Sequence, residues 1–341
     1  MNAGDLSTLL VWAAATSFTI ALIAYTVDMA RIAEQAQKRT PAAVPAMAGG
    51  PGAGPVSAAA GSAGEAAPDR SRRAEGIARS THLLGVALLF GGIVARGIAA
   101  GRWPTANMYE FTLVGVFMAT LVLAVVQRRR AIPFISVVVL GLAVLFLATA
   151  LLKFYVQAEA VQPALQSYWL VLHVGVAISA TGIFTVAFAA AVLQVLRDGR
   201  ENDHSHLVEP WSRGDGLRRA LSGWAVTGPR FAWLEQVPDA RRLEAMSFRL
   251  NAVGFVLWTF TLIAGAIWAE HAWGRYWGWD PKEIGTFVAW VVYAAYLHAR
   301  TTRGWSGRRA AYFVFVGYAC VLANFTVINL FVTGKHSYSG L

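Results

Sequence analysis

The sequence predicts an all-α fold, a polytopic transmembrane helical bundle with about eight spanning helices. Of its 341 residues, 56% are hydrophobic and only 14% are charged, whereas about a quarter of the residues of a soluble domain carry a charge. The apolar residues are gathered into long stretches, and the basic residues lie in short runs between them. Together these observations indicate that much of the surface faces lipid.

Eight stretches are long enough to cross a bilayer, since a helix rises about 1.5 Å per residue and a span needs about 20 apolar residues. They lie at about residues 6–27, 81–100, 110–126, 132–152, 168–196, 250–268, 284–300 and 310–333. The first lacks a basic n-region and a cleavage site, so residues 1–30 are interpreted as a retained membrane helix. Residues 31–79, which contain an Ala-, Gly-, Pro- and Ser-rich segment, predict a flexible cytoplasmic linker. Residues 80–341 then form a membrane domain of seven helices.

Lysines and arginines near the ends of the spans predict the orientation, because they are enriched in cytoplasmic loops. They are concentrated in segments 31–79, 128–130, 197–249 and 300–309, which fall on one side if the spans alternate. Both termini and the segments 101–109, 153–167 and 269–283 are therefore expected on the extracytoplasmic side. Arg96, Arg102, Lys153 and Arg275 are exceptions to the rule. Residues 231–250 mix aromatic and basic side chains, which is typical of a helix on the membrane surface.

The net charge and the cysteine content narrow the classes of function. A formal net charge of +10 raises nucleic acid as a partner, but the charges lie in short runs between spans rather than on one face. No nucleic-acid partner is therefore expected. The single cysteine, Cys320, lies in an apolar stretch and cannot form an internal disulfide, a CxxC redox pair or a thiolate zinc site. Redox chemistry would need a cofactor or a partner protein.

The histidines fall at two levels of the predicted bundle. His82 and His298 lie at the cytoplasmic ends of their spans, whereas His173 and His336 lie at the outer level. Ionisable side chains at membrane depth mark functional sites, although a single histidine can simply bond a neighbouring carbonyl. Paired imidazoles from different helices are how a bundle holds a haem with two axial histidines. Zinc is disfavoured, because no thiolate, HExxH motif or carboxylate cluster completes a tetrahedral set.

The segment WGRYWGWDPKE, residues 273–283, is too aromatic for an ordinary aqueous loop. An interfacial aromatic belt is the structural alternative, but a belt does not need three tryptophans so close together. The glycines between the rings allow them to approach a flat ligand, and indole faces can cover a porphyrin. Trp273, Trp277 and Trp279 are therefore predicted to form the wall of a haem site, with Arg275 or Lys282 pairing with a propionate.

The end of the same segment predicts the start of a helix. Asp280 suits an N-cap, Pro281 suits the first helical position, and Glu283 can complete a capping box. This role is compatible with a ligand site, because the cap holds the loop against the helix. No residue is assigned as catalytic beyond positioning the haem.

WGRYWGWDPKE resembles the tryptophan-rich WWD signature of the haem-handling membrane proteins of cytochrome c biogenesis. The segments GRWPTANMYE, YWLVLHV, WVVYAAYLHAR and NLFVTGKHSY narrow the resemblance to the CcsA/ResC family of System II, whose members are also called CcsB. The resemblance covers most of the chain from about residue 80 onward. The chain length and the C-terminal GKHSY favour this family over the larger haem lyases of System I.

The resemblance implies a role for each histidine pair. In the family two external histidines flank the WWD loop and ligate the haem to be attached, and the matching positions are His173 and His336. Two membrane histidines are thought to bind haem on its way across, and these match His82 and His298. His271 has no counterpart. The implied activity is that of holocytochrome c synthase, in which haem b is carried outside and presented for thioether attachment to the CxxCH of apocytochrome c.

The resemblance also implies partners and a location. The expected partners are a ResB/Ccs1-type membrane protein that completes the synthase, apocytochrome c, membrane lipid and, indirectly, extracytoplasmic thiol-disulfide reductants. The expected location is the bacterial plasma membrane, with the WWD loop at 268–283 outside. Two alternatives stay open, a haem transporter without attachment activity and a b-type haem electron-transfer subunit. A transporter usually shows paired halves, which this sequence does not show, and a b-type subunit has less need of a Trp-rich loop.

Overall fold

A computed structural model describes the chain except residues 1, 40–66, 129–132, 159–166, 212 and 337–341. Every regular element within the described residues is helical, which confirms the predicted all-α class. In chain order the elements are α1 (Ala3–Arg39), α2 (Ala67–Ala100), α3 (Met108–Val126), α4 (Pro133–Thr149), the π-helix η1 (Ala150–Phe154), α5 (Tyr168–Glu201), α6 (Asp215–Leu221), η3 (Ser222–Trp224), η4 (Pro229–Gln236), α7 (Ala240–Trp273), α8 (Pro281–Thr302), α9 (Arg308–Phe325) and α10 (Val327–Phe331).

Seven helices in the described ranges are long and apolar enough to cross a membrane, against about eight expected. They are α1, α2, α3, α4 with η1, α5, α7, and α9 with α10. The helix expected at 284–300 also forms, as the 22-residue α8, which is about 33 Å long at 1.5 Å per residue. Because α8 carries more polar residues and tyrosines, it is not among the seven helices that are apolar enough to cross a membrane. The predicted polytopic bundle is confirmed, with α8 as its least apolar long helix.

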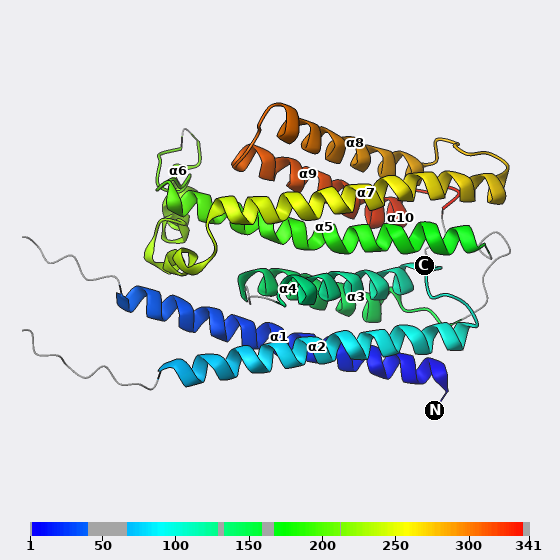
Figure 1. Ribbon diagram of the computed structural model, residues 1–341, viewed down its shortest axis with the longest axis horizontal. Helices are drawn as coiled ribbons and strands as arrows, with labels where there is room; N and C mark the ends of the chain where they lie inside the picture. The colour runs from blue at the N-terminus through cyan, green and yellow to red at the C-terminus, as the bar shows by residue number, and fades with distance from the viewer. Residues whose placement is uncertain (1, 40–66, 129–132, 159–166, 212, 337–341) are drawn as a thin grey trace, which may run out of the picture.

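The first two helices form an antiparallel pair along one edge of the bundle (Figure 1). Two hydrogen bonds between the helices show how they are aligned. Ser7 Oγ donates to Gly92 O at 2.7 Å, and Ser17 Oγ donates to Thr81 O at 2.8 Å. A Cβ atom at Gly85 would lie 2.6 Å from the ring of Phe18. Glycine at this position therefore permits the close approach of the two helices.

Both helices of this pair extend into the segment predicted as linker. Helix α1 continues to Arg39 and α2 begins at Ala67, so the predicted linker at 31–79 is helical at both of its ends. The remaining part, residues 40–66, lies outside the described residues. The helical ends follow from the many alanines and arginines there, which favour helix once the chain leaves the bilayer.

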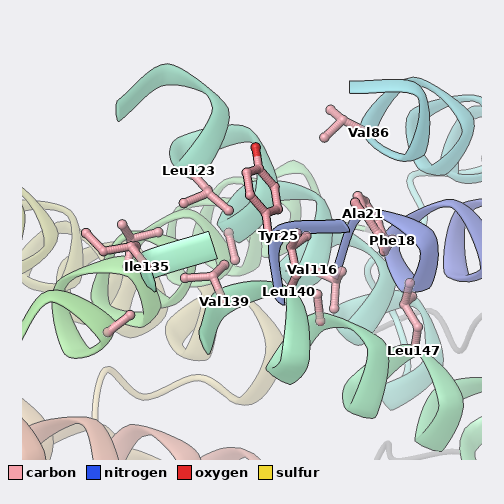
Figure 2. Packing of buried hydrophobic residues seen from close by; sticks show 14 of the residues in the cluster. Phe18, Ala21, Tyr25, Val86, Val116, Leu123, Ile135, Val139, Leu140 and Leu147 are labelled. Atoms are coloured by element: carbon pink, nitrogen blue, oxygen red, sulfur yellow. The ribbon is translucent and has the colours of Figure 1, made fainter. Parts of the chain in front are cut away.

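Side chains from α1, α3 and α4 form one hydrophobic core (Figure 2). Phe18 and Tyr25 of α1, Leu123 of α3, and Ile135 and Val139 of α4 are fully buried members of this core. A second core joins α5, α7, α8 and α9. Helix α5 contacts α3, α4, α7 and α9, so it lies between the two cores and connects them.

The segment between α5 and α7 differs from the prediction of a helix on the membrane surface at 231–250. It divides at Asp239, whose side chain accepts from Arg242 N and caps α7. Before the cap, Trp233 stacks on Phe134 with ring centroids 4.7 Å apart, and Leu234 is fully buried. After the cap, the chain is already the first part of α7. Trp233 and Leu234 thus pack on the end of the bundle.

Candidate functional site

The two outer histidines line the same cavity, although they come from distant parts of the chain. His173 lies in the second turn of α5, and His336 lies five residues after the end of α10. The cavity has an empty volume of about 960 Å³, part of it open to solvent, which is within the usual range of ligand pockets. Its walls come from the start of α3 and from α5, α7, α8 and α9. Helix packing therefore brings the predicted outer pair to one cavity.

Each of these imidazoles has its Nδ1 atom held by an oxygen. His173 Nδ1 donates to the carbonyl oxygen of Thr261 at 2.9 Å, and His336 Nδ1 donates to Asp280 Oδ2 at 2.7 Å. Both oxygens can only accept, so Nδ1 carries the proton in each ring. The lone pair on Nε2 is then free to bind a metal. This arrangement, with one nitrogen hydrogen-bonded and the other available, is the usual one for a histidine that ligates iron.

Glycine at 265 makes room for His173 against α7. A Cβ atom built at Gly265 would lie 2.7 Å from Cε1 and 2.8 Å from Nδ1 of His173. Any larger residue would displace the ring from Thr261 O. The seat of this imidazole therefore depends on close packing of α5 and α7 as well as on the hydrogen bond.

Asp280 connects the loop, the next helix and the C-terminal segment. It caps α8 by accepting from Lys282 N at 3.2 Å, and it accepts from Lys335 N at 2.6 Å. Glu283 completes the capping box by accepting from Asp280 N at 3.0 Å. The predicted cap is confirmed. Asp280 also orients His336, a role that sequence reasoning did not find.

The protonation states of this pair support a neutral imidazole. Burial lowers the pKa of His336 below its usual value by more than the neighbouring Asp280 carboxylate raises it. Burial raises the pKa of Asp280, but hydrogen bonds from His336 and from Lys335 N outweigh burial and hold it below its usual value. Near neutral pH, Asp280 is thus a carboxylate and His336 is a neutral ring, which is the form that binds iron.

Two indoles line the cavity, those of Trp258 and Trp268, and neither was among the predicted wall residues. Trp268 is the one beside His173. Its side chain is 1% exposed and lies parallel to the His173 ring, with centroids 6.2 Å apart and an interplanar angle of 8°. Trp273 lies behind it, with its ring centroid 4.8 Å from that of Trp268 and 5.0 Å from that of His336. Helix α7 continues through both residues, so residues 268–273 of the expected aromatic loop are helical.

The other two tryptophans of the WWD segment lie farther out. Trp277 is 37% exposed and lines a smaller neighbouring pocket that also includes His173 and His336. Trp279 is 73% exposed, and it has a left-handed backbone with φ of 58°. Of the three predicted wall residues, Trp273 is therefore packed on the histidines, Trp277 lies beside them, and Trp279 faces outward.

Of the two predicted partners for a propionate, only Lys282 lies at the cavity. Its Nζ atom donates to Asn324 O at 2.8 Å and to Asn329 Oδ1 at 2.7 Å. The guanidinium of Arg275 covers Gly278 instead, where a Cβ atom would lie 1.9 Å from Cζ of the arginine. Arg275 thus shapes the loop, and Lys282 places its amino group at the cavity, where burial lowers its pKa to about 7 against the raising effect of Asp280.

The inner histidines, His82 and His298, lie on different sides of the bundle. His82 is 2% exposed, and its Nε2 atom donates to Thr120 O at 3.1 Å. His298 lies on an exposed face of α8. Helix α2 packs mainly on α1 and α3, whereas α8 packs mainly on α7, α9 and α10, and Figure 1 shows the two helices at opposite edges. The structure does not bring these two rings together, and a shared haem there stays a prediction. His271 is exposed and bonds only its own helix, at Ile267 O.

A buried ion-pair cluster supports the wall of the cavity formed before α3. Glu110 is fully buried and accepts from Arg96 Nε at 3.0 Å and from Arg102 Nη1 at 2.7 Å. It also accepts from Ala106 N at 2.9 Å, and Asn107 caps α3 by accepting from Glu110 N at 2.9 Å. Arg96 and Arg102 were noticed only as exceptions to the charge rule. Their pairing with Glu110 holds residues 102–107 against the cavity.

The fold and the site define a polytopic membrane protein with two oriented histidines in one cavity. Comparison with known proteins shows which family the chain belongs to. The family model of the cytochrome C assembly protein matches residues 103–336. The cytochrome c biogenesis protein CcsA of Synechococcus sp. (strain CC9902) is 35% identical over 265 residues, which cover 74% of this chain and 83% of the relative. CcsA of Prochlorococcus marinus (strain MIT 9303) is 34% identical over 252 residues, covering 72% and 79%.

The chain belongs to the CcsA family of System II cytochrome c biogenesis. Its function therefore lies in cytochrome c maturation. Among solved structures, the cytochrome c heme lyase CcmF has a similar fold, with a TM-score of 0.58 and 15% identity. The match covers 95% of this chain but 47% of CcmF, so the chain spans about half the length of that protein. At this identity the likeness concerns the fold alone.

Proposed function

We propose that this protein is the membrane component of a cytochrome c synthase, which holds haem b at its outer cavity and presents it for attachment to apocytochrome c. The observation that carries the proposal is the convergence of His173 and His336 on one cavity, each with Nδ1 held by an oxygen. The cavity suits a haem. Apolar walls and Trp268 can cover the macrocycle, and Lys282 can pair with a propionate.

The chain contributes positioning, and the haem and apocytochrome are its substrates. His173 and His336 would ligate the iron through Nε2, and Asp280 would keep His336 oriented. Each cysteine thiol of the CxxCH then adds across a haem vinyl group. One S–C bond forms, the S–H bond breaks, and the proton moves to the second vinyl carbon, so the addition needs no oxidant. Holding the vinyl edge near the thiols supplies the rate gain that orientation gives.

The remaining parts of the proposal concern partners and direction. A ResB/Ccs1-type membrane protein would complete the synthase, and extracytoplasmic thiol-disulfide reductants would keep the CxxCH reduced, since this chain has one cysteine. The start of α1 and the α7–α8 loop lie at the same end of the bundle (Figure 1). This supports the proposal that both lie on the extracytoplasmic side of the bacterial plasma membrane. His82 and His298 would receive haem from the cytoplasmic side, and α2 and α8 would have to approach each other for both to bind one haem.

Co-expression of the full chain with a ResB-type partner and a CxxCH reporter tests this function. Covalent haem on the reporter, detected after denaturing electrophoresis, is expected with the wild type. We expect His173→Ala and His336→Ala to abolish it, and added imidazole to restore part of it. His271→Ala is the matched control, because this histidine is exposed and contacts Ile267 O and Glu270 Oε2 of its own helix.

The spectrum of the purified complex distinguishes the alternatives. Six-coordinate low-spin haem is expected in the wild type and is expected to be lost in both alanine variants. Normal attachment in either variant would refute the assignment of the outer ligands. Haem that is bound and released without thioether formation would indicate a transporter, and haem that only cycles its redox state would indicate a b-type electron-transfer subunit.

A further inference from the structure

A second cavity lies directly beneath the proposed haem site, toward the other end of the bundle. It has an empty volume of about 460 Å³, part of it open to the surroundings, and is lined by α3, α4, α5 and α9. Phe111, Thr181 and Phe325 line both cavities. The lower cavity continues past them along α3 to Ala119 and along α5 to Thr185. The two cavities are therefore stacked along the bundle axis and share one boundary.

Two phenylalanine rings from different helices form part of that boundary. Phe111, in the first turn of α3, and Phe325, the last residue of α9, are stacked with centroids 4.8 Å apart and an interplanar angle of 21°. Helix α9 ends at Phe325 beside this stack, and α10 begins at Val327 after the single residue Thr326. An interrupted helix gives Phe325 a place where a small backbone change moves the ring.

The two cavities differ in whether charged or ionisable side chains line them. The lower cavity is lined by apolar residues and by the hydroxyls of Thr112, Thr181, Thr185 and Tyr318, without a charged side chain among its lining residues. The upper cavity contains Lys282 and the two histidines. A flat, largely apolar ligand with acidic groups at one edge would be drawn upward, acid edge first, because Lys282, the one Lys or Arg among the described residues lining the two cavities, is above the stack.

The inner end of the lower cavity reaches the level of a predicted haem ligand. Ala119 lines the cavity, and the next residue on α3, Thr120, accepts the hydrogen bond from His82 Nε2 at 3.1 Å. The cavity and His82 thus contact adjacent residues of α3. The lower cavity therefore has the Phe111–Phe325 stack at its outer end and lies close to the predicted inner ligand at its inner end.

We propose that the lower cavity is the transit site for haem and that the Phe111–Phe325 stack is the gate between it and the outer site. This inference rests on the proposed function and adds the route to it. The rings close the boundary when no haem passes. During transit they separate and cover the faces of the porphyrin, since aromatic rings stack on flat apolar ligands. Lys282 then receives the propionates, and His173 and His336 receive the iron.

Filling the lower cavity tests the route without touching the outer site. A Cβ atom at Gly115, which lines this cavity, would have Ile178 Cγ2 as its nearest neighbour at 3.8 Å, so a leucine can enter the empty space. The matched control is Gly141→Leu in α4, where a Cβ atom meets nothing within 4 Å and which lies outside the cavity lining. Ala143→Leu fills the same cavity from α4 and serves as the second variant.

Two measurements on the full chain with its partner distinguish the loading of haem in cells from the binding of haem at the outer site. The first is the low-spin haem content of the complex purified from cells. The second is the low-spin spectrum obtained when haemin is added to haem-free complex in nanodiscs, where it reaches the outer cavity directly. We expect Gly115→Leu and Ala143→Leu to lose most of the haem loaded in cells but to bind added haemin as the wild type does. Gly141→Leu is expected to match the wild type in both measurements.

The outcomes are distinct for the two proposals. Normal loading in cells for both cavity-filling variants would overturn the transit route and leave the outer site standing. A wild-type complex that never shows low-spin haem by either measurement would overturn the proposed function itself. If one variant also fails to bind added haemin, its fold is disturbed and the other variant decides. Phe111→Leu, which removes the ring stack, is expected to speed the exchange of haemin between the outer site and the lower cavity.

Discussion

The carboxylate of Asp280 offers the sharpest test of how the outer site is held together. It accepts hydrogen bonds from His336 Nδ1, from Lys335 N and from Lys282 N. Asp280→Asn changes the charge of this acceptor with little change in shape. Asparagine is about as good an N-cap as aspartate, so α8 should still begin at Pro281. Asparagine keeps only one of the two carboxylate oxygens. Either Oδ2, which accepts from both His336 Nδ1 and Lys282 N, or Oδ1, which accepts from Lys335 N, becomes an NH2 group that cannot accept.

The size of the effect follows from the bonds that lose a charged partner. A hydrogen bond to a charged group contributes about 1.5–3 kcal/mol and a neutral one about 0.5–1.5 kcal/mol. The bonds from His336 Nδ1 and Lys335 N, at 2.7 and 2.6 Å, lie on a carboxylate that is 6% exposed. Weakening both would cost about 1.5–3 kcal/mol, or about a 10- to 100-fold loss of haem affinity. That agrees with the loss of about 10- to 100-fold usual for a residue that orients a metal ligand.

The assay is the rate at which haem leaves the nanodisc complex for excess apomyoglobin, with the low-spin spectrum recorded at the start. Asp239→Asn is the matched control, because Asp239 caps α7 by accepting from Arg242 N and lies far from the cavity. Asp280→Ala should also lose the cap, at a further cost of about 1 kcal/mol in thermal stability. Haem release from Asp280→Asn at the wild-type rate would refute the role of Asp280 in orienting His336.

Two further predictions concern packing and pH. Gly182→Ala would place a Cβ atom 2.9 Å from the backbone nitrogen of Ala119, and we expect it to lower the free energy of unfolding by about 1–3 kcal/mol. Gly175→Ala in the same helix meets nothing within 4 Å and should be neutral or stabilising by up to about 1 kcal/mol; equal melting temperatures would contradict the close contact of α3 and α5. The folded pKa of His336 is below its usual value, so its contribution is present above about pH 6.5 and is lost as the pH falls through the folded pKa. Low-spin absorbance should therefore decline on titration from pH 7.5 to 5, and a signal that grows with acid would contradict this sign.

The sequence predicted the features that depend on local pattern. Apolar stretches of sufficient length gave the helices, and the order Asp280, Pro281, Glu283 gave the cap of α8, which the structure confirms. The shared level of His173 and His336 followed from counting spans. Their meeting at one cavity is a consequence of how α5 packs against α7 and α9.

The features that sequence reasoning missed depend on distant contacts. Asp280 and His336 are 56 residues apart, and nothing local to either indicates their hydrogen bond. The sequence alone did not distinguish Trp268 from an interfacial tryptophan. In the structure its ring stacks on His173 of α5. Trp279 carries the same side chain but faces outward. In a segment with several indoles, the helix boundary decides which one is buried, and that boundary lies five residues later than the pattern suggested.

The pairing of Arg96 with Glu110 also constrains how the chain enters the bilayer. An isolated charged side chain costs about 2.5–3.5 kcal/mol at the centre of an inserting helix, and less toward its ends. Arg96 lies near the end of α2, and its carboxylate partner follows 14 residues later, in the first turn of α3. The translocation machinery would therefore receive the partner almost as soon as the arginine. We expect α2 and α3 to leave it as a hairpin, with the ion pair already formed, whereas a chain cut after α2 would insert poorly.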